Sequence, residues 1–377
     1  MARRAVAEVN LAAIERNAEL LRGRIPAHTQ LCAVVKANGY GHGAVQVAGA
    51  ALRGGATVLA VVTSGEAGEL RRAGLDAPIL VLGAISDEEL PEAVAADAEL
   101  TAWDPGYVER LRLLAKQTGR PIGVHVKFDT GMGRLGTRSL DQALATVHAV
   151  LAAAPALRLA GVMTHFATAD GDQDFVAQQL EEFGPFVAEA RALATTDITV
   201  HAANSAAILR VPHSHFDMVR AGIALYGCDP MNNDPDDHGL EPALALRSYV
   251  AAVKPIAPGQ SIGYSRRFIA ERDSQIATLP IGYGDGVVRA LANNCDVLIG
   301  GRRHPLRGMV SMDNITVDIG PESLAGVGDR ATLIGVDGPE RQTAEEVARR
   351  VNTISNEVLC WISKRVLRVY HRDGRPA

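Results

Sequence analysis

Eight short apolar runs recur between residue 30 and about residue 227, and a longer amphipathic or alanine-rich segment follows each. Strands that alternate with helices in this way favour a parallel (β/α)8 barrel, whose chemistry lies at the carboxyl ends of its strands. The runs are LCAVV from Leu31, TVLAVV from Thr57, PILVLG from Pro78, AELTAW from Ala98, IGVHVKF from Ile122, LAGVMTHF from Leu159, ITVHAAN from Ile198 and MVRAGIALYG from Met218.

The segments between these runs are typical of helices. One begins at Ala44, and in another Asp104 can cap a helix whose first turn accommodates Pro105. The pattern changes after Gly227, where CDPMNNDPDDHG is rich in Asp, Asn and Pro and indicates an interdomain linker.

The carboxyl half contains strand-like runs divided by Gly and Pro turns, with one good helix expected at about residues 343–359. We therefore predict an α/β chain with two domains: a (β/α)8 barrel over residues 1–236 and a mainly β domain over residues 237–377. The first ten or so residues are expected to pair with the second domain.

Composition narrows the class of protein. The chain has 377 residues, 47% of them hydrophobic and 21% charged, which is typical of a globular protein. A net charge of -5 argues against a nucleic-acid surface and favours small-molecule ligands. The four cysteines are far apart and form no CxxC pair, so they suggest neither a disulfide framework nor a zinc site. We expect a reducing compartment and no metal.

Neither a signal peptide nor a membrane span is expected. The start, MARRAVAEVNLAAIERNAELL, has acidic residues where a signal peptide has a continuous apolar core. The long alanine-rich stretch from Ala143 to Met163 is interrupted by His148, Pro155 and Arg158. The chain is therefore predicted to be soluble and cytoplasmic, without a membrane partner.

Lys36 stands at the end of the first apolar run, in AVVKANGYGHG. One interpretation is a lysine that extends from a strand end to solvent. The other is a nucleophile at the mouth of a barrel, with Gly39, Gly41 and Gly43 letting the backbone pass close to a ligand. A lysine that forms an imine with pyridoxal phosphate needs further groups around it: donors for the phosphate, a partner for the ring nitrogen and a receptor for the substrate carboxylate.

Candidates for the phosphate donors follow the last barrel strands. Backbone N–H groups of Gly222 and Ile223 lie after the eighth run, a common place for a phosphate site in this fold. Ser205, expected at the end of the seventh strand, and Tyr40 could add hydroxyl donors. A serine after a strand is also a common helix cap.

Cationic residues could serve the ring nitrogen and the substrate. Arg220 lies close to where the ring would sit and, because it keeps its proton, would leave the ring nitrogen an acceptor. Its alternative role is a barrel-top ion pair. His165 could orient Arg220, or could simply pack. Arg134, in the KFDTGMGRLG loop with Lys127, could bind a carboxylate bidentately, and that loop could equally be a structural turn.

The motifs together resemble alanine racemases, in order and in approximate spacing, over nearly the whole chain. The motifs are AVVKANGYGHG, KFDTGMGRLG, MTHFATAD, HAANS, VRAGIALYG, IGYSRRF, PIGYGDG and MVSMDN. The resemblance implies a racemase that makes D-alanine for peptidoglycan with pyridoxal phosphate bound to Lys36. Lys36 would be the base facing the D-substrate, and Tyr264 the opposing base.

The same resemblance implies a homodimer. In it, Tyr264, Met312 and Asp313 of one subunit complete the barrel site of the other. It also implies a carbamate on Lys127 that holds Arg134 in place. Two bases on opposite sides of a planar carbanion are the minimum for racemisation.

Asn356, in NTISNEVLC, stands where the family usually has a tyrosine, and Ser311 replaces a cysteine found in many members. The shorter, polar Asn356 could admit a hydroxymethyl group, as in racemases of this family that accept serine. Serine is therefore an additional or even preferred substrate by this interpretation. Three alternatives stay open: a serine racemase proper, a barrel-type pyridoxal-phosphate decarboxylase, and a non-catalytic carrier of the cofactor.

Overall fold

The structure is a computed structural model that describes residues 3–377, and it divides into two compact units. The barrel unit comprises Glu15–Gly39 and Ala44–Leu225. The second unit comprises Tyr40–Gly43, Tyr226–Ala377 and the described residues up to Ile14. The chain thus leaves the barrel unit briefly after its first strand and finally near residue 225.

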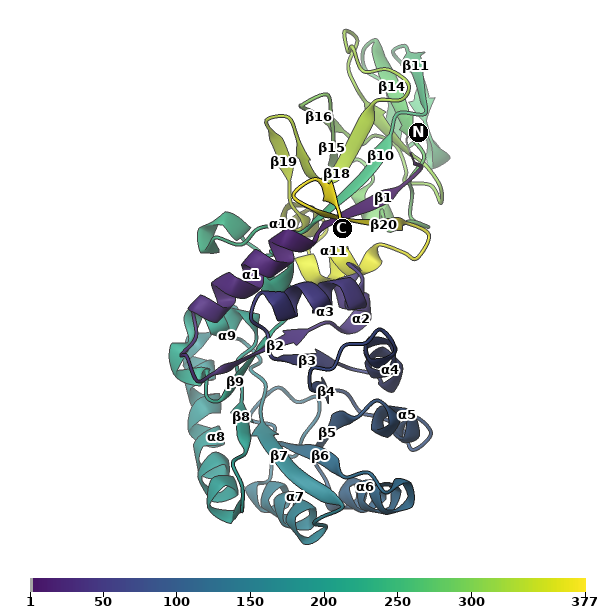
Figure 1. Ribbon diagram of the computed structural model, residues 1–377. Coiled ribbons are helices and arrows are strands. Elements are labelled where there is room, and N and C mark those ends of the chain that lie inside the picture. The colour runs from purple at the N-terminus through teal and green to yellow at the C-terminus, as the bar shows by residue number, and fades with distance from the viewer. Residues whose placement is uncertain (1–2) are drawn as a thin grey trace. The chain divides into compact units, whose positions relative to one another are not determined.

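The barrel unit contains a closed barrel of strands β2 to β9, joined in parallel around the ring (Figure 1). Strand β9 pairs with β2, with Met218 opposite Gln30, and this pairing closes the barrel. The eight predicted strands are confirmed. They are β2 (Gln30–Val34), β3 (Val58–Val61), β4 (Ile79–Val81), β5 (Ala98–Ala102), β6 (Ile122–Lys127), β7 (Leu157–Met163), β8 (Thr199–His201) and β9 (Met218–Ala221).

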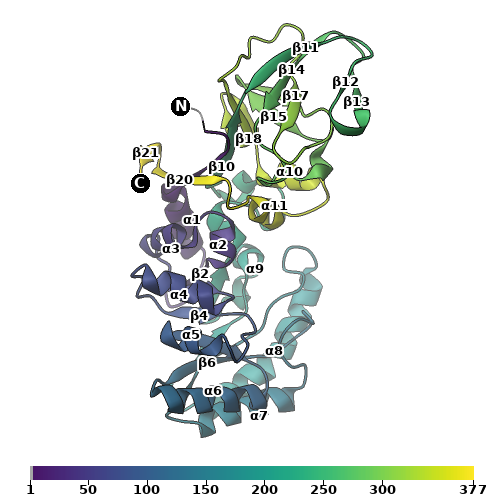
Figure 2. The same ribbon diagram turned by 90° about the vertical axis from the view of Figure 1, so that its right-hand side faces the viewer.

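Helices alternate with these strands and lie outside the ring (Figures 1 and 2). Asp104 caps α6 as predicted, because its Oδ1 accepts the Tyr107 N–H at 2.8 Å. The helices are α1 (Leu11–Gly23), α2 (Lys36–Tyr40), α3 (Ala44–Arg53), α4 (Ser64–Arg72), α5 (Leu90–Ala95), α6 (Pro105–Thr118), α7 (Leu140–Ala152), α8 (Gln173–Leu193), α9 (Ser205–Arg210), η1 (Pro212–Ser214) and η2 (Ile223–Tyr226).

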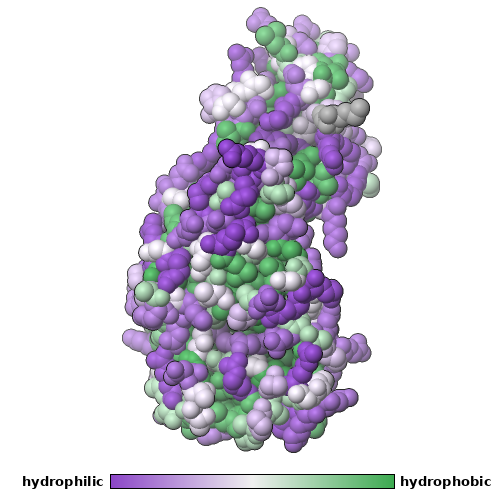
Figure 3. All heavy atoms as spheres, viewed as in Figure 1, coloured by the Kyte–Doolittle hydropathy of each residue, from purple (hydrophilic) through white to green (hydrophobic). Residues whose placement is uncertain are grey.

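The hydrophobic core of this unit is largely aliphatic and includes the fully buried Leu31, Leu59 and Leu80. Burying each such side chain contributes about 2 kcal/mol. The outer face of this unit mixes hydrophilic and hydrophobic residues, without one dominant apolar patch on the side that Figure 3 shows. Of the helices within residues 3–377, none has the length and apolarity needed to cross a membrane.

The second unit is mainly β. Its largest sheet has the order β16-β15-β18-β10-β1-β20-β21, with β19 paired to β18. Strand β1 (Val6–Asn10) lies between β10 and β20, antiparallel to the first and parallel to the second. The amino-terminal strand is therefore an interior member of a sheet otherwise built from the end of the chain.

The remaining elements of this unit complete two smaller sheets, β11-β14-β17 and β12-β13, and short helices. They are β10 (Leu244–Tyr249), β11 (Ala252–Ile256), β12 (Ser261–Ile262), β13 (Phe268–Ile269), β14 (Ser274–Leu279), β15 (Asp296–Ile299), β16 (Arg302–Pro305), β17 (Ile315–Asp318), β18 (Arg330–Asp337), β19 (Glu340–Gln342), β20 (Leu367–Arg372), β21 (Arg375–Pro376), η3 (Pro235–His238), η4 (Tyr264–Arg266) and η5 (Arg289–Leu291).

The single late helix expected over residues 343–359 is wrong, because the segment forms two helices, α10 (Ala344–Arg350) and α11 (Ser355–Trp361). Thr343 caps α10 by accepting the Glu346 N–H. The helix ends where Asn352 adopts a left-handed φ of 56°. An asparagine tolerates this conformation better than most residues, so it can terminate a helix as glycine does.

Candidate active site

Lys36 follows β2 after one residue and begins a left-handed turn. Residues Ala37 to Tyr40 have φ angles between 48° and 60°. Left-handed backbone costs roughly 1–2 kcal/mol for each non-glycine residue, so neighbouring groups must hold it. The Ala37 N–H donates to Glu66 Oε1 at 2.6 Å, and the Asn38 side chain accepts the Ala44 N–H at 3.1 Å. The half-buried Lys36 is thus placed by a constrained segment.

Gly41 is required by its neighbours in the second unit. It has a φ of 81°, and a Cβ atom there would lie 2.5 Å from the carbonyl oxygen of Leu359. Arg368 Nε donates to the Gly41 carbonyl at 3.0 Å. The structure therefore gives a reason for this glycine other than the approach of a ligand. Beside it, the buried Tyr40 packs on Tyr226 with ring centroids 4.8 Å apart.

Arg220, in β9, is a buried cation, with 3% of its surface exposed. Its Nη1 donates to His201 Nδ1 at 2.8 Å, and its Nη2 lies 3.0 Å from His165 Nδ1. Nη2 also donates to the carbonyl oxygens of Thr164 and Ala202. No carboxylate within residues 3–377 forms an ion pair with it. The barrel-top ion pair considered from the sequence is therefore absent from this part of the chain.

Burial and neighbouring cations set the protonation of this group. Burial lowers the pKa of Arg220 to about 10, which still leaves it a cation at neutral pH. Burial, and then the Arg220 charge, lower the pKa of His165 well below its ordinary value. His165 is therefore a neutral acceptor for Arg220. This hydrogen bond supports the expectation that His165 orients Arg220, which stays a prediction.

Ser205 lies at the start of a helix instead of at the end of a strand. The seventh barrel strand, β8, ends at His201, and Ser205 is the first residue of α9, which Asn204 caps. The expectation that Ser205 ends the strand is therefore wrong. Its Oγ accepts the N–H of Gly222 at 2.9 Å and of Ala224 at 3.3 Å.

These groups form a small cluster of backbone donors around one hydroxyl. Backbone N–H groups at the start of η2, which begins at Ile223, gather around the Ser205 hydroxyl. A helix start leaves its first N–H groups without intrahelical partners, and such groups bind phosphate well. A phosphate group fits this place as a further acceptor beside the Ser205 hydroxyl. Separately, no carboxylate of residues 3–377 pairs with the buried Arg220, which leaves its charge available to another part of the cofactor.

Lys127 is the last residue of β6 and is 3% exposed. Burial, the charge of Arg220 and then that of Arg134 lower its pKa to about 8. Its amine is therefore partly neutral near physiological pH. Arg134 itself is exposed and forms no hydrogen bond or ion pair with the part of the chain that the structure describes. It is free to meet a ligand carboxylate.

The loop that carries Arg134 is shaped by Asp129. This carboxylate accepts the N–H groups of Gly131 and Gly133 and the Nε–H of Arg138. Burial alone would raise the pKa of Asp129, but these hydrogen bonds outweigh it and lower the pKa.

The other predicted residues belong to the second unit. Tyr264, at the start of η4, is 71% exposed, and Met312 is 51% exposed. Asn356 is the second residue of α11 and half-buried; among residues 3–377 its amide makes no hydrogen bond. Ser311 Oγ closes a turn by donating to the Asn314 carbonyl at 2.7 Å. Tyr264 and Met312 thus present apolar surface outward.

Asp313 takes part in an ion network around the buried Asp285. Arg4 donates to Asp285 at 2.6 and 2.8 Å, and Arg365 donates to Asp313 at 2.7 Å. Asp285 also accepts the Gly282 N–H, while the Gly284 N–H donates to the Met312 carbonyl. The network therefore supports the loop that bears Met312 and Asp313.

Three residues of the barrel interior were missed from the sequence: Glu99, His125 and His201. They lie on β5, β6 and β8 and are hydrogen-bonded in series to Arg220. A signal was present, because a histidine interrupts each of the apolar runs IGVHVKF and ITVHAAN. No group of three or more His, Cys, Asp or Glu side chains suited to a metal occurs within residues 3–377.

Two family descriptions match this chain: "Alanine racemase, N-terminal domain" over residues 9–230 and "Alanine racemase, C-terminal domain" over residues 243–370. The chain is 41% identical to "Alanine racemase 1" of Bacillus subtilis over 98% of this chain and 93% of that one. It is 39% identical to "Alanine racemase 2" of Caldanaerobacter subterraneus subsp. tengcongensis over 97% of this chain and 95% of that one.

Solved structures agree with this likeness. The alanine racemase from D-cycloserine-producing Streptomyces lavendulae has a TM-score of 0.94 at 36% identity, with 98% of each chain covered. The alanine racemase from Bacillus anthracis with bound L-Ala-P has a TM-score of 0.91 at 37% identity, covering 100% of this chain and 97% of that one.

The Asp285 network generates a prediction about the Met312 loop. Asp285→Ala removes a fully buried carboxylate that accepts from Arg4 and from the Gly282 N–H, so the loop should open more readily. We expect amide hydrogen exchange at residues 282–286 and 311–313 to accelerate about tenfold or more, on the scale of one charge-assisted hydrogen bond. Asp313→Ala, at an exposed partner of the same network, is the control and should change exchange less. Equal exchange in the Asp285→Ala variant and the wild type would contradict the role of Asp285.

Proposed function

This chain belongs to the alanine racemase family, and we propose that it interconverts L- and D-alanine with pyridoxal phosphate as cofactor and with Lys36 and Tyr264 as the two bases. It is an isomerase by its family. The observation that most supports the cofactor is the buried Arg220 guanidinium, which lies among neutral acceptors and pairs with no carboxylate of residues 3–377.

Each cofactor-binding role falls to a residue whose local structure suits it. Lys36 would hold the cofactor through Nζ. Ser205, with the backbone N–H groups of Gly222 and Ile223, would receive the phosphate, to which the Tyr40 hydroxyl adds a donor. Burial raises the pKa of Tyr40, so its phenol keeps the proton that it would donate. His165 would keep Arg220 aimed at the ring nitrogen.

The reaction needs a proton removed from one face of the substrate and another delivered to the opposite face. Pyridoxal phosphate, when bound, supplies the electron-withdrawing ring that makes the substrate α-proton acidic. Lys36 Nζ would take or deliver the proton on the face of the D-substrate, and Tyr264 Oη on the face of the L-substrate. Arg220 keeps its own proton, which makes the ring a weak electron acceptor and favours prompt return of the proton.

We further propose a homodimer in which Tyr264 of the partner subunit, together with the partner's Met312 and the partner's Asp313, completes each barrel site. Large exposed side chains such as Tyr264 and Met312 are typical of surfaces that become covered in an assembly. The reaction would take place in the cytoplasm and supply D-alanine for peptidoglycan.

The direct test is racemisation of L-alanine by the cofactor-saturated protein, with the D-product separated by chiral chromatography. Lys36→Ala should abolish turnover, and Tyr264→Phe should lower it about 10²- to 10⁴-fold in at least one direction while the cofactor stays bound. Lys116→Ala, on the exposed face of α6, and Tyr249→Phe, in β10, are the matched controls. A Tyr264→Phe variant with full turnover both ways would contradict the two-base proposal and favour a carrier of the cofactor.

The same assay separates the remaining alternative. A barrel-type decarboxylase releases CO2 from its amino acid, whereas a racemase conserves total alanine while the L-isomer declines. Arg220 disfavours decarboxylation, because an acidic partner of the ring nitrogen is expected there and a guanidinium is present instead.

A carbamate on Lys127 would join this lysine to Arg134, which binds the substrate carboxylate. Carbamate forms from a neutral amine and CO2, and the pKa of Lys127 is lowered to about 8, mainly by burial. At constant CO2 pressure, a ¹³C-carbamate NMR signal should therefore grow as the pH rises through about 8 and fade below it. The signal should vanish in Lys127→Ala and persist in the surface control Lys254→Ala. A signal insensitive to Lys127→Ala would place the carbamate elsewhere.

Asn356 is proposed to admit serine beside alanine. Its amide is half-buried and makes no hydrogen bond within residues 3–377, so it can meet a substrate hydroxyl. Asn356→Tyr should lower kcat/KM for serine relative to alanine by about tenfold or more, the range of one lost polar contact with added bulk. Glu357→Gln, at the next and exposed position of α11, should leave the ratio unchanged. Negligible serine turnover in the wild type would refute this specificity.

A further inference from the structure

A chain of hydrogen bonds crosses the interior of the barrel and ends on Arg220. Glu99 Oε2 lies 2.9 Å from His125 Nε2, and His125 Nδ1 lies 2.9 Å from His201 Nε2. His201 Nδ1 in turn lies 2.8 Å from Arg220 Nη1. Both histidines are buried, with at most 2% of their surface exposed. We call this series the interior relay.

The direction of the interior relay follows from its fixed ends. Arg220 has only N–H donors, so His201 Nδ1 must accept and a neutral His201 carries its proton on Nε2. Burial, and then the Arg220 charge, lower the pKa of His201 well below its ordinary value, which keeps this ring neutral.

The same reasoning extends to the second ring. The His201 Nε2–H donates to His125, so His125 Nδ1 must accept and the proton of this ring sits on Nε2. There it donates to the carboxylate of Glu99, which can only accept. Every donor therefore points from Arg220 towards Glu99.

Two glycines leave space for the interior relay. A Cβ atom at Gly161, in β7, would lie 2.5 Å from His125 Nδ1, and one at Gly123, in β6, would lie 2.9 Å from Glu99 Cγ and Oε1. Glycine inside a strand weakens it and often marks the close approach of another group. Two strand positions therefore carry no side chain where the interior relay passes.

The far end of the interior relay is at the floor of the barrel. Glu99 is the second residue of β5, near its amino end, whereas Arg220 is near the carboxyl end of β9. Glu99 also accepts from the exposed Arg158 at 2.5 Å and borders a floor hollow of about 790 Å³. Burial would raise the pKa of Glu99, but His125 and Arg158 outweigh it and lower the pKa to about 2. Glu99 is therefore an anion at neutral pH.

We propose that Glu99, at the floor of the barrel, is a positioning residue for the racemisation: it fixes the protons of His125 and His201 so that Arg220 always meets an acceptor. This rests on the proposed function, in which Arg220 faces the cofactor ring. Without an acceptor at position 99, both rings can reverse, with His125 Nδ1–H donating to His201 Nε2. His201 would then present an N–H to the Arg220 N–H, and the guanidinium would lose its orientation.

The test combines NMR of the imidazole nitrogens with kinetics on the cofactor-saturated protein. The wild type should show His125 and His201 as neutral rings protonated on Nε2, assigned with His125→Gln and His201→Gln. Glu99→Leu should give a mixture of ring tautomers and lower kcat for alanine about tenfold, the scale of one hydrogen bond to a charged group, with KM nearly unchanged. Glu99→Gln keeps a carbonyl acceptor and should restore both the proton pattern and most of kcat.

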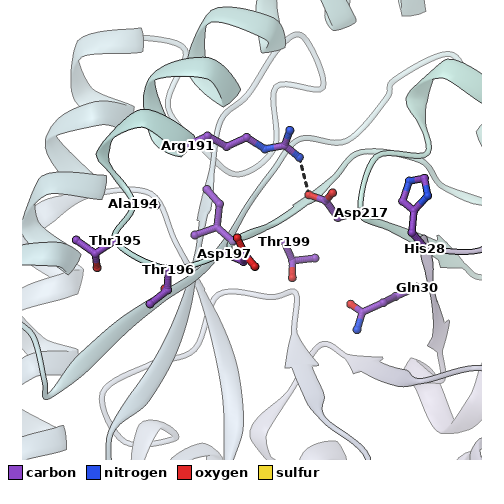
Figure 4. A pocket seen from close by; sticks show the side chains of 10 residues that line it. His28, Gln30, Arg191, Ala194, Thr195, Thr196, Asp197, Thr199 and Asp217 are labelled. Atoms are coloured by element: carbon purple, nitrogen blue, oxygen red, sulfur yellow. Dashed lines mark hydrogen bonds and ion pairs between the residues drawn. The ribbon is translucent and has the colours of Figure 1, made fainter.

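Asp217→Asn is the matched control. Asp217 is another floor carboxylate paired with an arginine, since Arg191 Nη2 donates to it at 2.8 Å, and it borders a separate polar hollow with Thr199 and Gln30 (Figure 4). Its carboxylate also accepts the Val200 N–H at 2.8 Å, and within residues 3–377 it makes no hydrogen bond to an imidazole of the relay. Its variant should keep kcat within about twofold, the range of most surface substitutions.

Gly123→Ala provides a second route if Glu99→Leu does not fold, because the added methyl group meets Glu99 and should displace it from His125. It should lower kcat in the same direction as Glu99→Leu. A wild-type spectrum with a proton on Nδ1 of either ring, or a folded Glu99→Leu variant with wild-type kcat, would overturn the proposal. A wild type that does not racemise alanine would instead overturn the proposed function, and the NMR spectrum would still decide the proton pattern.

Discussion

The buried guanidinium of Arg220 needs hydrogen-bond acceptors, and several side chains and carbonyls of the barrel interior are arranged to provide them. A cation removed from water must find acceptors for its N–H groups, and this one finds imidazole nitrogens and backbone carbonyls instead of a carboxylate. A carboxylate in direct contact would hold the charge within the protein. Neutral acceptors leave much of it available to a ligand, and the nearest anion in the interior relay, Glu99, acts only through two rings. The strand glycines Gly123 and Gly161 make room for this arrangement, because a Cβ atom at either position would collide with Glu99 or His125.

The turn after Lys36 shows a second way in which the fold fixes its chemistry. A run of left-handed residues is unfavourable, and the side chain of Glu66, from α4, holds it through the Ala37 N–H. Glu66 also accepts the N–H groups of Val62 and Thr63 before that helix. One carboxylate thus joins the segment after Lys36 to a helix cap, so the lysine is positioned by the packing of two successive βα units.

The sequence predicts the architecture well because each strand and helix is encoded locally. The apolar runs and the Asp104–Pro105 cap carry their signals within a few residues. The late helix was predicted too long because the left-handed Asn352 is a single residue inside a helical pattern. Lys36 was identifiable as a candidate for a similar reason, since a lysine that ends an apolar run is conspicuous.

What could not be predicted depends on pairings far apart in the chain. His125 and His201 are 76 residues apart, and a strand histidine gives no indication of whether it faces into the barrel or outward. Arg4 meets Asp285 across 281 residues. Such contacts follow from the closure of the barrel and the sheet order, not from any local pattern.

The charges around Lys36 indicate what the barrel is built to receive. The charges of Arg220, Arg134 and Lys36 all lower the pKa of Lys127, while Asp129 is the carboxylate that opposes them. Asp129 is itself engaged by Gly131, Gly133 and Arg138. Neither Arg220 nor Arg134 forms an ion pair within residues 3–377, so their repulsion with Lys127 is costly to maintain. A phosphate beside Ser205 and a carboxylate beside Arg134 would remove that cost, so the electrostatics of the barrel favour a ligand with two separate anionic groups.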